Sequence, residues 1–411
     1  MTRTSESAVH TAAAVNRSMF AVFAVFALNG IVFASWAARI PAAAEALGIG
    51  AGGTGVLLLF SAIGSVIALP LGGAVAARIT NAGAVRAGGL TTSAASLLIA
   101  YGLSAGSMPL TAAGLLVFGA GIALWDVAMN LEGADVERRL GRTMMPRFHA
   151  AFSGGSFVGA LIGAGLAALG ISLPLHLLGV LTVVAVTVLL LPRSFLPARP
   201  VRSRAASGGA PADAGRDRRR GGAWTEGRTL LIGVVVLGAA LTEGAANDWV
   251  AKATVDGLGT TETAGALMFA VFVASMTATR WVGSTLIDRF GRVRTLRWCM
   301  GASLAGLLVF VFAPNVWLAG AGAVLWGIGA ALGFPTGMSA AGEDPQHAAA
   351  RVSVVSTLGY MAFFVGPPVL GFFGELWGIR TALLLVAGAM LVSILAAPAA
   401  REQRGTASTP E

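Results

Sequence analysis

The chain has 411 residues; 56% are hydrophobic, only 11% are charged, and the mean hydropathy is +0.78. Soluble globular proteins carry charged side chains at about a quarter of their positions, so this composition excludes that class. A net charge of +9 would suit a nucleic-acid partner, but the charges are placed as in a membrane protein, and we expect no such partner. The single cysteine excludes a disulfide within one chain, and the four scattered histidines lack metal-ligand spacing.

Apolar runs of about 18 or more residues, the length that indicates a transmembrane helix, recur along the chain. We predict twelve spans, six on each side of a polar central segment, and therefore an all-α membrane protein. The predicted spans are residues 18–38, 54–77, 87–104, 109–131, 148–170 and 173–192, followed by 229–250, 261–287, 295–313, 316–341, 351–375 and 379–398.

The central segment, residues 193–228, cannot lie in hydrocarbon. It holds nine arginines and three acidic residues among proline, glycine, alanine and serine, a composition typical of a disordered, solvated linker. It separates residues 1–192 from residues 229–411, which we expect to form two six-helix bundles. The run of arginines at 218–220 could contact nucleic acid, but contact with anionic lipid at the membrane surface is the preferred interpretation.

The placement of arginine and lysine predicts the topology. With the N-terminus inside, 24 of the 28 cationic residues fall in cytoplasmic segments, and only Arg39, Lys252 and Arg380 fall in outer ones. The positive-inside rule then places both termini in the cytoplasm of a multi-pass protein of the cell membrane. Three tryptophans near span ends are predicted to form an interfacial aromatic belt: Trp36, Trp249 and Trp317.

Two matches at nearly the same offset indicate an internal duplication. The pattern G-x-G-x-A-L at residues 119–124 recurs at residues 327–332, an offset of 208, and the turn at residues 73–78 aligns with residues 284–289, an offset of 211. Each match alone is weak, because small residues are common where membrane helices pack closely. Together they favour two pseudo-symmetric halves.

Twelve spans in two halves with a long central loop resemble the major facilitator superfamily. The sharpest local match is the stretch D-R-F-G-R-V-R at residues 288–294, which is similar to the D-R-x-G-R-R turn of that superfamily. In the first half, residues 77–81 keep only the arginine, Arg78. The resemblance implies a secondary transporter that works by alternating access of a site between the halves.

A finer resemblance concerns the fourth and tenth spans. The stretch L-W-D-V-A-M-N at residues 124–130 is similar to L-E-T-A-x-N in fucose-permease-like proton symporters, and residues 333–336 resemble their tenth helix. This implies that the carboxylate of Asp126 is a substrate or proton site. Residues 35–38, Ser-Trp-Ala-Ala, lack the acidic residue of those symporters, so the resemblance does not extend to fucose itself. Residues 154–163 also lack the proline motif of drug antiporters, which favours import over export.

Four ionisable side chains lie well inside predicted spans, whereas the others lie in loops or at span ends: Asp126, Glu243, Asp248 and Arg280. Each costs about 2.5–3.5 kcal/mol on insertion scales, so such residues face a cavity and have a function there. Asp126 has Asn130 four residues later on the same helix face. Because burial disfavours a charged carboxylate, Asp126 is expected to take up and release a proton; the alternative is a carboxylate whose charge is fixed by a neighbouring helix.

Other residues are assigned by depth and by the resemblance. His149 lies at a similar depth in span 5 and is either a hydrogen-bond partner of Asp126 or simply solvated. Glu243 is the second candidate for proton coupling, and His149 is the third. In the superfamily, the first and fourth helices of each half line the central cavity. The resemblance therefore implies a substrate site formed by Asn29, Asp126, Asn130, Glu243 and Trp326.

A buried arginine needs an anion, and the sequence offers Arg280 two. Asp126 would give an ion pair that breaks during transport, whereas Asp288 and loop carboxylates would give a static lock, which we favour. Asp288 would also interact with the positive end of the following helix. Arg280, Asp288 and Arg289 are therefore the predicted gating residues.

The sequence thus predicts a secondary transporter for a small polar or amphipathic solute, sugar-like or another organic metabolite, through proton-coupled symport. We expect a monomer in the bilayer with no cofactor and the proton gradient as its energy source. An enzyme is not expected, because no nucleophile, base and orienting group recur at workable spacing, and no phosphate-binding loop is present. The alternatives are a proton-coupled exporter of drugs or metabolites, and a non-transporting receptor or scaffold with a transporter fold.

Overall fold

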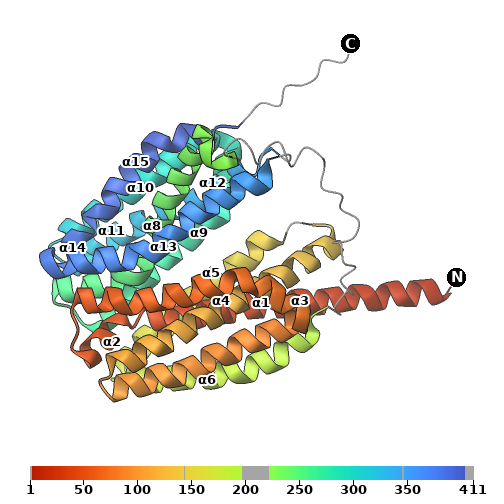
Figure 1. Ribbon diagram of the computed structural model, residues 1–411, viewed down its shortest axis with the longest axis horizontal. Coiled ribbons are helices and arrows are strands. Elements are labelled where there is room, and N and C mark those ends of the chain that lie inside the picture. The colour runs from red at the N-terminus through yellow and green to blue at the C-terminus, as the bar shows by residue number, and fades with distance from the viewer. Residues whose placement is uncertain (1, 143, 197–221, 345–346, 403–411) are drawn as a thin grey trace, which may run out of the picture. The chain divides into compact units, whose positions relative to one another are not determined.

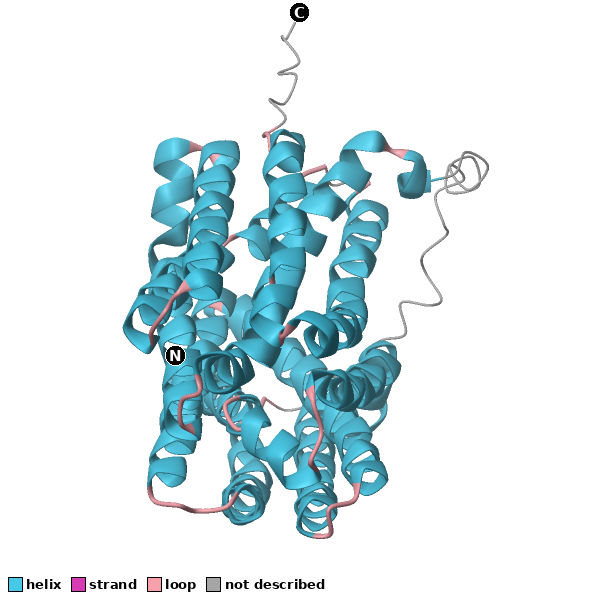
Figure 2. Cartoon of the chain, turned by 90° about the vertical axis from the view of Figure 1, so that its left-hand side faces the viewer, coloured by secondary structure: helices cyan, strands magenta, loops and turns pink. Residues whose placement is uncertain are grey.

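The computed structural model describes residues 2–142, 144–196, 222–344 and 347–402, without the side chains of residues 2–12 and 349. Every regular element in these ranges is a helix (Figures 1 and 2). Most of the predicted linker, residues 197–221 with the arginine run, lies outside the described residues. The described parts of the linker begin and end in short 3-10 helices, η1 (Leu191–Ser194) and η3 (Gly222–Thr225).

The helices follow the predicted spans closely. In chain order they are α1 (Thr2–Ala37), α2 (Ile40–Leu47), α3 (Ala51–Ser104), α4 (Met108–Leu140), α5 (Met145–Ala168), α6 (Leu173–Leu190), α8 (Gly227–Leu258), α9 (Glu262–Phe290), α10 (Arg292–Phe312), α11 (Val316–Ala330), α12 (Gly333–Ala341), α13 (Ala348–Trp377), α14 (Ile379–Ala382), α15 (Leu384–Ala396) and η4 (Ala397–Ala400). Within the described residues, eleven helical segments are long and apolar enough to cross a membrane.

The longest of these segments, α3, accounts for two crossings. Its 54 residues would span about 80 Å as one straight helix, far more than the roughly 30 Å of a bilayer's hydrocarbon. The backbone of Thr80, at φ 70° and ψ 162°, leaves the helical region and divides α3 into two spans. The fold therefore has the twelve membrane-spanning helices that the sequence predicted, six in each half.

Thr80 has a counterpart in the second half. Gly291, between α9 and α10, has φ 79° and ψ 158°, nearly the conformation of Thr80. The two residues are 211 positions apart, the offset of the repeat found in the sequence. Glycine adopts this region readily, whereas a β-branched residue there is strained. The second half thus has glycine, the residue that this turn favours, whereas the first half forms the same turn with threonine.

Helix crossings are also matched between the halves. A Cβ atom added to Gly121 on α4 would lie 2.8 Å from the backbone nitrogen of Thr92 on α3, and one added to Gly329 on α11 would lie 2.3 Å from that of Ser303 on α10. Thr92 and Ser303 are again 211 positions apart. These glycines let the backbones approach closely, which is why the G-x-G pattern recurs. The pseudo-symmetric halves are therefore confirmed.

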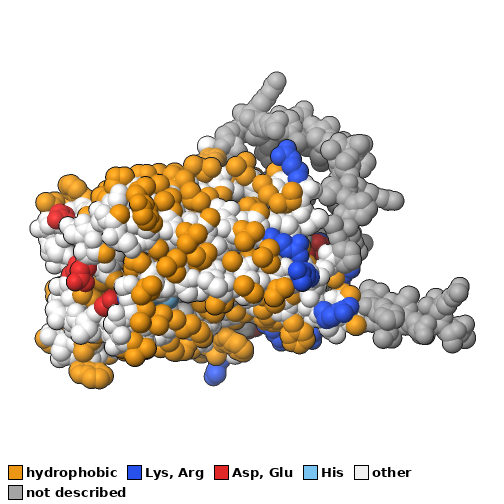
Figure 3. Space-filling view, turned by 90° about the horizontal axis from the view of Figure 1, so that it is seen from below, with side chains coloured by type: hydrophobic (Ala, Val, Ile, Leu, Met, Phe, Trp, Pro, Cys, Tyr) orange, Lys and Arg blue, Asp and Glu red, His pale blue; other side chains and the backbone are white. Residues whose placement is uncertain are grey.

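The outer surfaces of the helices suit a lipid environment. Large apolar side chains stand exposed along α6 and α15, including Val183, Val186 and Leu395, and Figure 3 shows hydrophobic side chains over the middle of the visible face. The predicted aromatic belt is only partly correct. Trp317 is 86% exposed, but Trp36 and Trp249 are buried, because their rings pack inside the protein instead of facing lipid.

Contacts group the chain into two compact units. The first contains Met1–Ser203, Asn247–Thr277 and Pro367–Ala382; the second contains Arg204–Ala246, Ala278–Gly366 and Leu383–Glu411. In the first unit, α3 packs along α4 and α6, and α1 packs along α5; in the second, α10 packs along α11 and α15 (Figure 1). The division of domains at residues 192 and 229 follows the sequence repeat and remains a prediction.

Candidate functional site

Asp126 lies in the middle of α4, half-buried, with Asn130 one turn later. The Asn130 amide nitrogen donates to the carbonyl oxygen of Asp126 at 2.8 Å and to its carboxylate oxygen at 3.2 Å. No ion pair to Asp126 occurs among the residues that the structure describes. The carboxylate is therefore oriented by an amide but is not balanced by a cation, which is unfavourable for a charged group in this environment.

Glu243 on α8 pairs with Arg280 on α9. One guanidinium nitrogen of Arg280 donates to the Glu243 carboxylate at 2.8 Å, and its Nε donates to the carbonyl oxygen of Ala331 at 3.1 Å. The Ala331 carbonyl is available because α11 ends at Ala330, where the last carbonyls of a helix lack partners within it. Both predicted partners of Arg280 were therefore wrong: neither Asp126 nor Asp288 holds it.

The remaining predicted substrate residues are both buried. Asn29 on α1 is 1% exposed, and its amide nitrogen has no hydrogen-bond partner within the described part of the chain. Trp326 is fully buried on α11, with its ring centroid 5.7 Å from that of Phe310 on α10. Trp326 thus fills a helix interface, the position of a packing residue, whereas Asn29 has a donor to offer.

The five predicted substrate residues belong to two compact units. Asn29, Asp126 and Asn130 lie in the first, and Glu243 and Trp326 lie in the second. The structure brings Asp126 to Asn130 and Glu243 to Arg280. A single site formed by all five residues remains a prediction.

His149 and the predicted gating residues near the turn are exposed. The ring of His149 stands edge-on to that of Phe26 at 5.3 Å, and its hydrogen bond to Asp126 remains a prediction. Asp288 and Arg289 lie in the last turn of α9, where the guanidinium carbon of Arg289 lies 5.3 Å from the ring centroid of Phe290. Their gating role is likewise a prediction.

One buried carboxylate was missed in the sequence. Glu132 on α4 is 1% exposed and accepts hydrogen bonds from Ser18 on α1 at 2.8 Å, from Asn81 on α3 at 3.0 Å and from the backbone nitrogen of Leu196 at 2.7 Å. It therefore ties four segments of the first unit together. The predicted span ended at residue 131, but α4 continues to Leu140, so the charge that seemed to mark a loop lies inside a helix.

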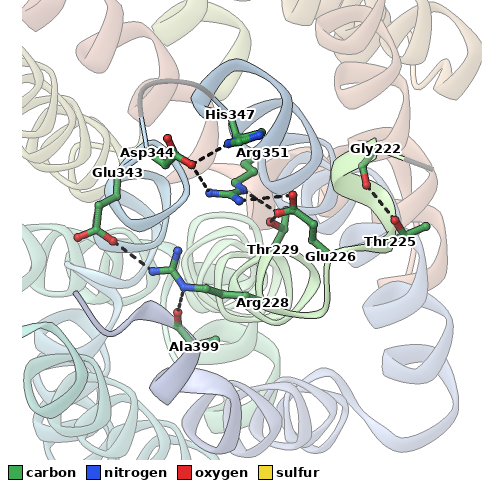
Figure 4. A network of polar contacts seen from close by, with 10 residues as sticks. All are labelled: Gly222, Thr225, Glu226, Arg228, Thr229, Glu343, Asp344, His347, Arg351 and Ala399. Atoms are coloured by element: carbon green, nitrogen blue, oxygen red, sulfur yellow. Dashed lines mark hydrogen bonds and ion pairs between the residues drawn. The ribbon is translucent and has the colours of Figure 1, made fainter. Parts of the chain in front are cut away.

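The second unit has a polar network around the start of α8 (Figure 4). Arg351 donates to Glu226 at 2.7 Å and to Asp344 at 3.2 Å, and the Asp344 carboxylate lies 2.7 Å from Nδ1 of His347. The hydrogen bond from Arg351 lowers the pKa of Glu226 below its usual 4.5. The network thus links the connection before α13 and the first turn of α13 to Glu226, the residue that precedes α8.

A second branch of this network centres on Glu343. Arg228 and Arg292 each donate to its carboxylate at 3.2 Å, and Arg228 also donates to the carbonyl oxygen of Ala399 at 3.1 Å. These contacts join α8, α10, η4 and the turn after α12 within the second unit. No spacing in the sequence indicates them, because the charges come from segments that are far apart in the chain.

Comparison with known proteins gives the family. A family model described as Major Facilitator Superfamily matches residues 230–410. The transporter y4wD of Sinorhizobium fredii is 31% identical, over 91% of this chain and 96% of its own length. An MFS-type transporter of Yersinia pestis is also 31% identical, over 88% of this chain and 90% of its own. These relatives are transporters, not enzymes.

Solved structures share the fold at low identity. A mutant of the nucleoside transporter NupG has a TM-score of 0.76 and 16% identity, covering 94% of this chain and 100% of its own. A mutant of the Escherichia coli fucose:proton symporter FucP has a TM-score of 0.62 and 16% identity, covering 94% of this chain and 98% of its own. At such identities the likeness concerns the fold alone.

Proposed function

The chain belongs to the Major Facilitator Superfamily and is a multi-pass membrane transporter; from that premise, we propose that it imports a small polar solute across the cell membrane together with protons. The arginine-rich loops face the cytoplasm in this proposal, as the positive-inside rule requires. Transport proceeds by alternating access, in which the pseudo-symmetric halves rock about the bound solute. The proton gradient supplies the energy, and no cofactor takes part.

The single observation that carries proton coupling is the contrast between Asp126 and Glu243. Arg280 balances the charge of Glu243, whereas Asp126 has an amide partner and no cation among the described residues. An uncompensated charge within a span is costly, and a proton on a carboxylate oxygen of Asp126 removes that cost. Proton binding and release at Asp126 therefore change the charge inside the half of the protein that contains Asp126. Proton coupling requires such a change of charge within the membrane. Glu243, the second candidate from the sequence, ranks behind Asp126 because Arg280 balances its charge. Asp248, which also lacks an ion pair within the described ranges, is an additional candidate.

The amides near Asp126 support a solute that carries hydroxyl groups. Asn130 presents its side chain on the same helix face, and the buried amide nitrogen of Asn29 has no partner in the described residues. Amides both donate to and accept from hydroxyl groups, and a buried donor without a partner costs free energy that a bound hydroxyl would recover. Structurally similar transporters are named for a nucleoside, fucose and xylose, all of them hydroxyl-bearing. We include Glu243, paired with Arg280, among the residues that line the site. We assign Trp326 a packing role at its helix interface and not a role in binding.

The test is transport in proteoliposomes. Binding of uridine, L-fucose and D-xylose is first ranked by thermal shift, and uptake of the best radiolabelled ligand is then measured with and without an inward proton gradient. We expect the gradient to raise wild-type uptake, and Asp126→Asn to lose that response while still exchanging labelled for unlabelled solute. Glu45→Gln, which removes an exposed carboxylate from α2, is the control and should behave as wild type. Unchanged gradient-driven uptake by Asp126→Asn would remove Asp126 from this role.

A further inference from the structure

Arg39 is a buried cation in a loop where the topology predicts few cations. It follows α1, is 2% exposed, and forms an ion pair with Glu262 through Nε. Its Nη2 donates to the other carboxylate oxygen of Glu262 at 3.2 Å and to the carbonyl oxygen of Ile171 at 3.0 Å. Glu262 is the first residue of α9, and all three residues belong to the first compact unit. The pair thus joins the loop after the first span to the start of the eighth span.

A second contact joins the two sequence halves at the same predicted outer side. The Glu375 carboxylate, near the end of α13, accepts a hydrogen bond at 2.9 Å from the backbone nitrogen of Gly52 in the first turn of α3. The N-cap of α3, Gly50, has no side chain to offer, so Glu375 supplies the capping carboxylate from a distant segment. A Cβ atom on Gly55 would lie 2.7 Å from the carbonyl oxygen of Pro367, so the two helices are in close contact there.

The internal repeat supplies a matched pair for comparison. The stretch Trp-Ala-Ala-Arg at residues 36–39 recurs as Trp-Val-Ala-Lys at residues 249–252, and Lys252 is 4% exposed. Lys252 pairs with Asp256 at 2.8 Å, one turn away on α8. Arg39 instead pairs with a carboxylate 223 residues away. Of these two equivalent buried cations, only Arg39 pairs with a carboxylate from the other half of the sequence.

We propose that the Arg39–Glu262 ion pair is the latch of the outer gate, and that it must break before solute can enter from the outer side. A buried cation that loses its carboxylate is strongly unfavourable. Removing Glu262 therefore raises the free energy of the latched conformation, and the population shifts toward the unlatched one. This inference depends on membership of the transporter family and on the predicted orientation, but not on proton coupling at Asp126.

Pulsed dipolar spectroscopy measures the gate directly. Spin labels are placed at Leu169→Cys, directly after α5, and at Trp317→Cys, in the first turn of α11, in a Cys299→Ser background. Both positions are exposed (76% and 86%) on the predicted outer side, and the distance between the labels reports the separation of the halves. We expect Glu262→Gln to increase the ratio of long to short distances about tenfold, a typical coupling. The matched control, Asp256→Asn, breaks the ion pair within α8 and should leave the distance distribution unchanged.

A double-mutant cycle separates the latch from general damage. Arg39→Gln and Glu262→Gln together should shift the ratio by less than the sum of the two single effects on a logarithmic scale, because both act through one pair. Additive effects, an unchanged ratio in folded Glu262→Gln protein, or an equal shift in Asp256→Asn would each overturn the proposal. Because the readout is a distance and needs no solute or proton gradient, its failure is distinguishable from a failure of the proposed transport mechanism.

Discussion

The matched turns at Thr80 and Gly291 predict opposite effects of reciprocal substitutions on stability. Thr80 occupies a region of backbone conformation that is almost restricted to glycine, at a cost of about 1–3 kcal/mol. Thr80→Gly relieves that cost. It also loses the hydrogen bond from the backbone nitrogen of Gly83 to the Thr80 hydroxyl, 3.2 Å long and exposed, at about 0.5 kcal/mol. The greater freedom of glycine in the unfolded chain takes away about another 0.5–1 kcal/mol. The net expectation is stabilisation by about 1 kcal/mol.

Gly291→Ala isolates the backbone term. A Cβ atom there would meet nothing within 4 Å, so its whole cost, about 1–3 kcal/mol, comes from the positive φ angle. Thermal unfolding of purified protein in detergent measures both variants. We expect the Tm of Thr80→Gly to rise by about 1–3 °C and that of Gly291→Ala to fall by more. A lower Tm for Thr80→Gly, or an unchanged Tm for Gly291→Ala, would refute the inferred strain.

Three further predictions concern carboxylates that hold hydrogen bonds or ion pairs. Glu132→Ala leaves three donors unsatisfied and should destabilise the protein by about 2–4 kcal/mol in chemical unfolding. Glu243→Gln leaves Arg280 without its anion and should lower the free energy of unfolding by about 1–3 kcal/mol. The double variant Glu243→Gln with Arg280→Gln should recover part of that loss. A double variant less stable than both single variants would contradict the pairing. The lowered pKa of Glu226 means that its pair with Arg351 stabilises the fold above pH 4.5 and is lost as pH falls below it. Tm should therefore drop more steeply below pH 4.5 in wild type than in Glu226→Gln.

The fold was accessible from the sequence because membrane burial leaves a strong signal. A span needs about 20 apolar residues, so run lengths predicted the helices and the interruption of α3, and arginine placement was consistent with that count. The repeat was readable because close helix crossings require glycine. Gly121 and Gly329 are such crossings, and they kept their spacing in both halves. A structural feature that requires one residue type at one position, such as glycine at a close helix crossing, can therefore be read from the sequence.

The partners of the charges were not accessible in the same way. Arg280 could have reached several anions, and its choice of Glu243 and the Ala331 carbonyl depends on where α11 breaks and how α8 is rotated. The burial of Trp36 and Trp249 also depends on rotation about helix axes, which composition does not specify. Glu132 was hidden because α4 extends past its apolar stretch. Arg39 could have been found, since Trp-Ala-Ala-Arg recurs as Trp-Val-Ala-Lys in the second half.

The most direct test of proton-coupled transport is the movement of protons with solute. Proteoliposomes that contain a trapped pH-sensitive dye, with no imposed gradient, receive the best-binding of uridine, L-fucose and D-xylose on the outside. The wild type should acidify the lumen as solute enters, and Asp126→Asn should pass solute without acidification. Solute entry by the wild type with no change in luminal pH, or equal acidification by Asp126→Asn, would contradict the account.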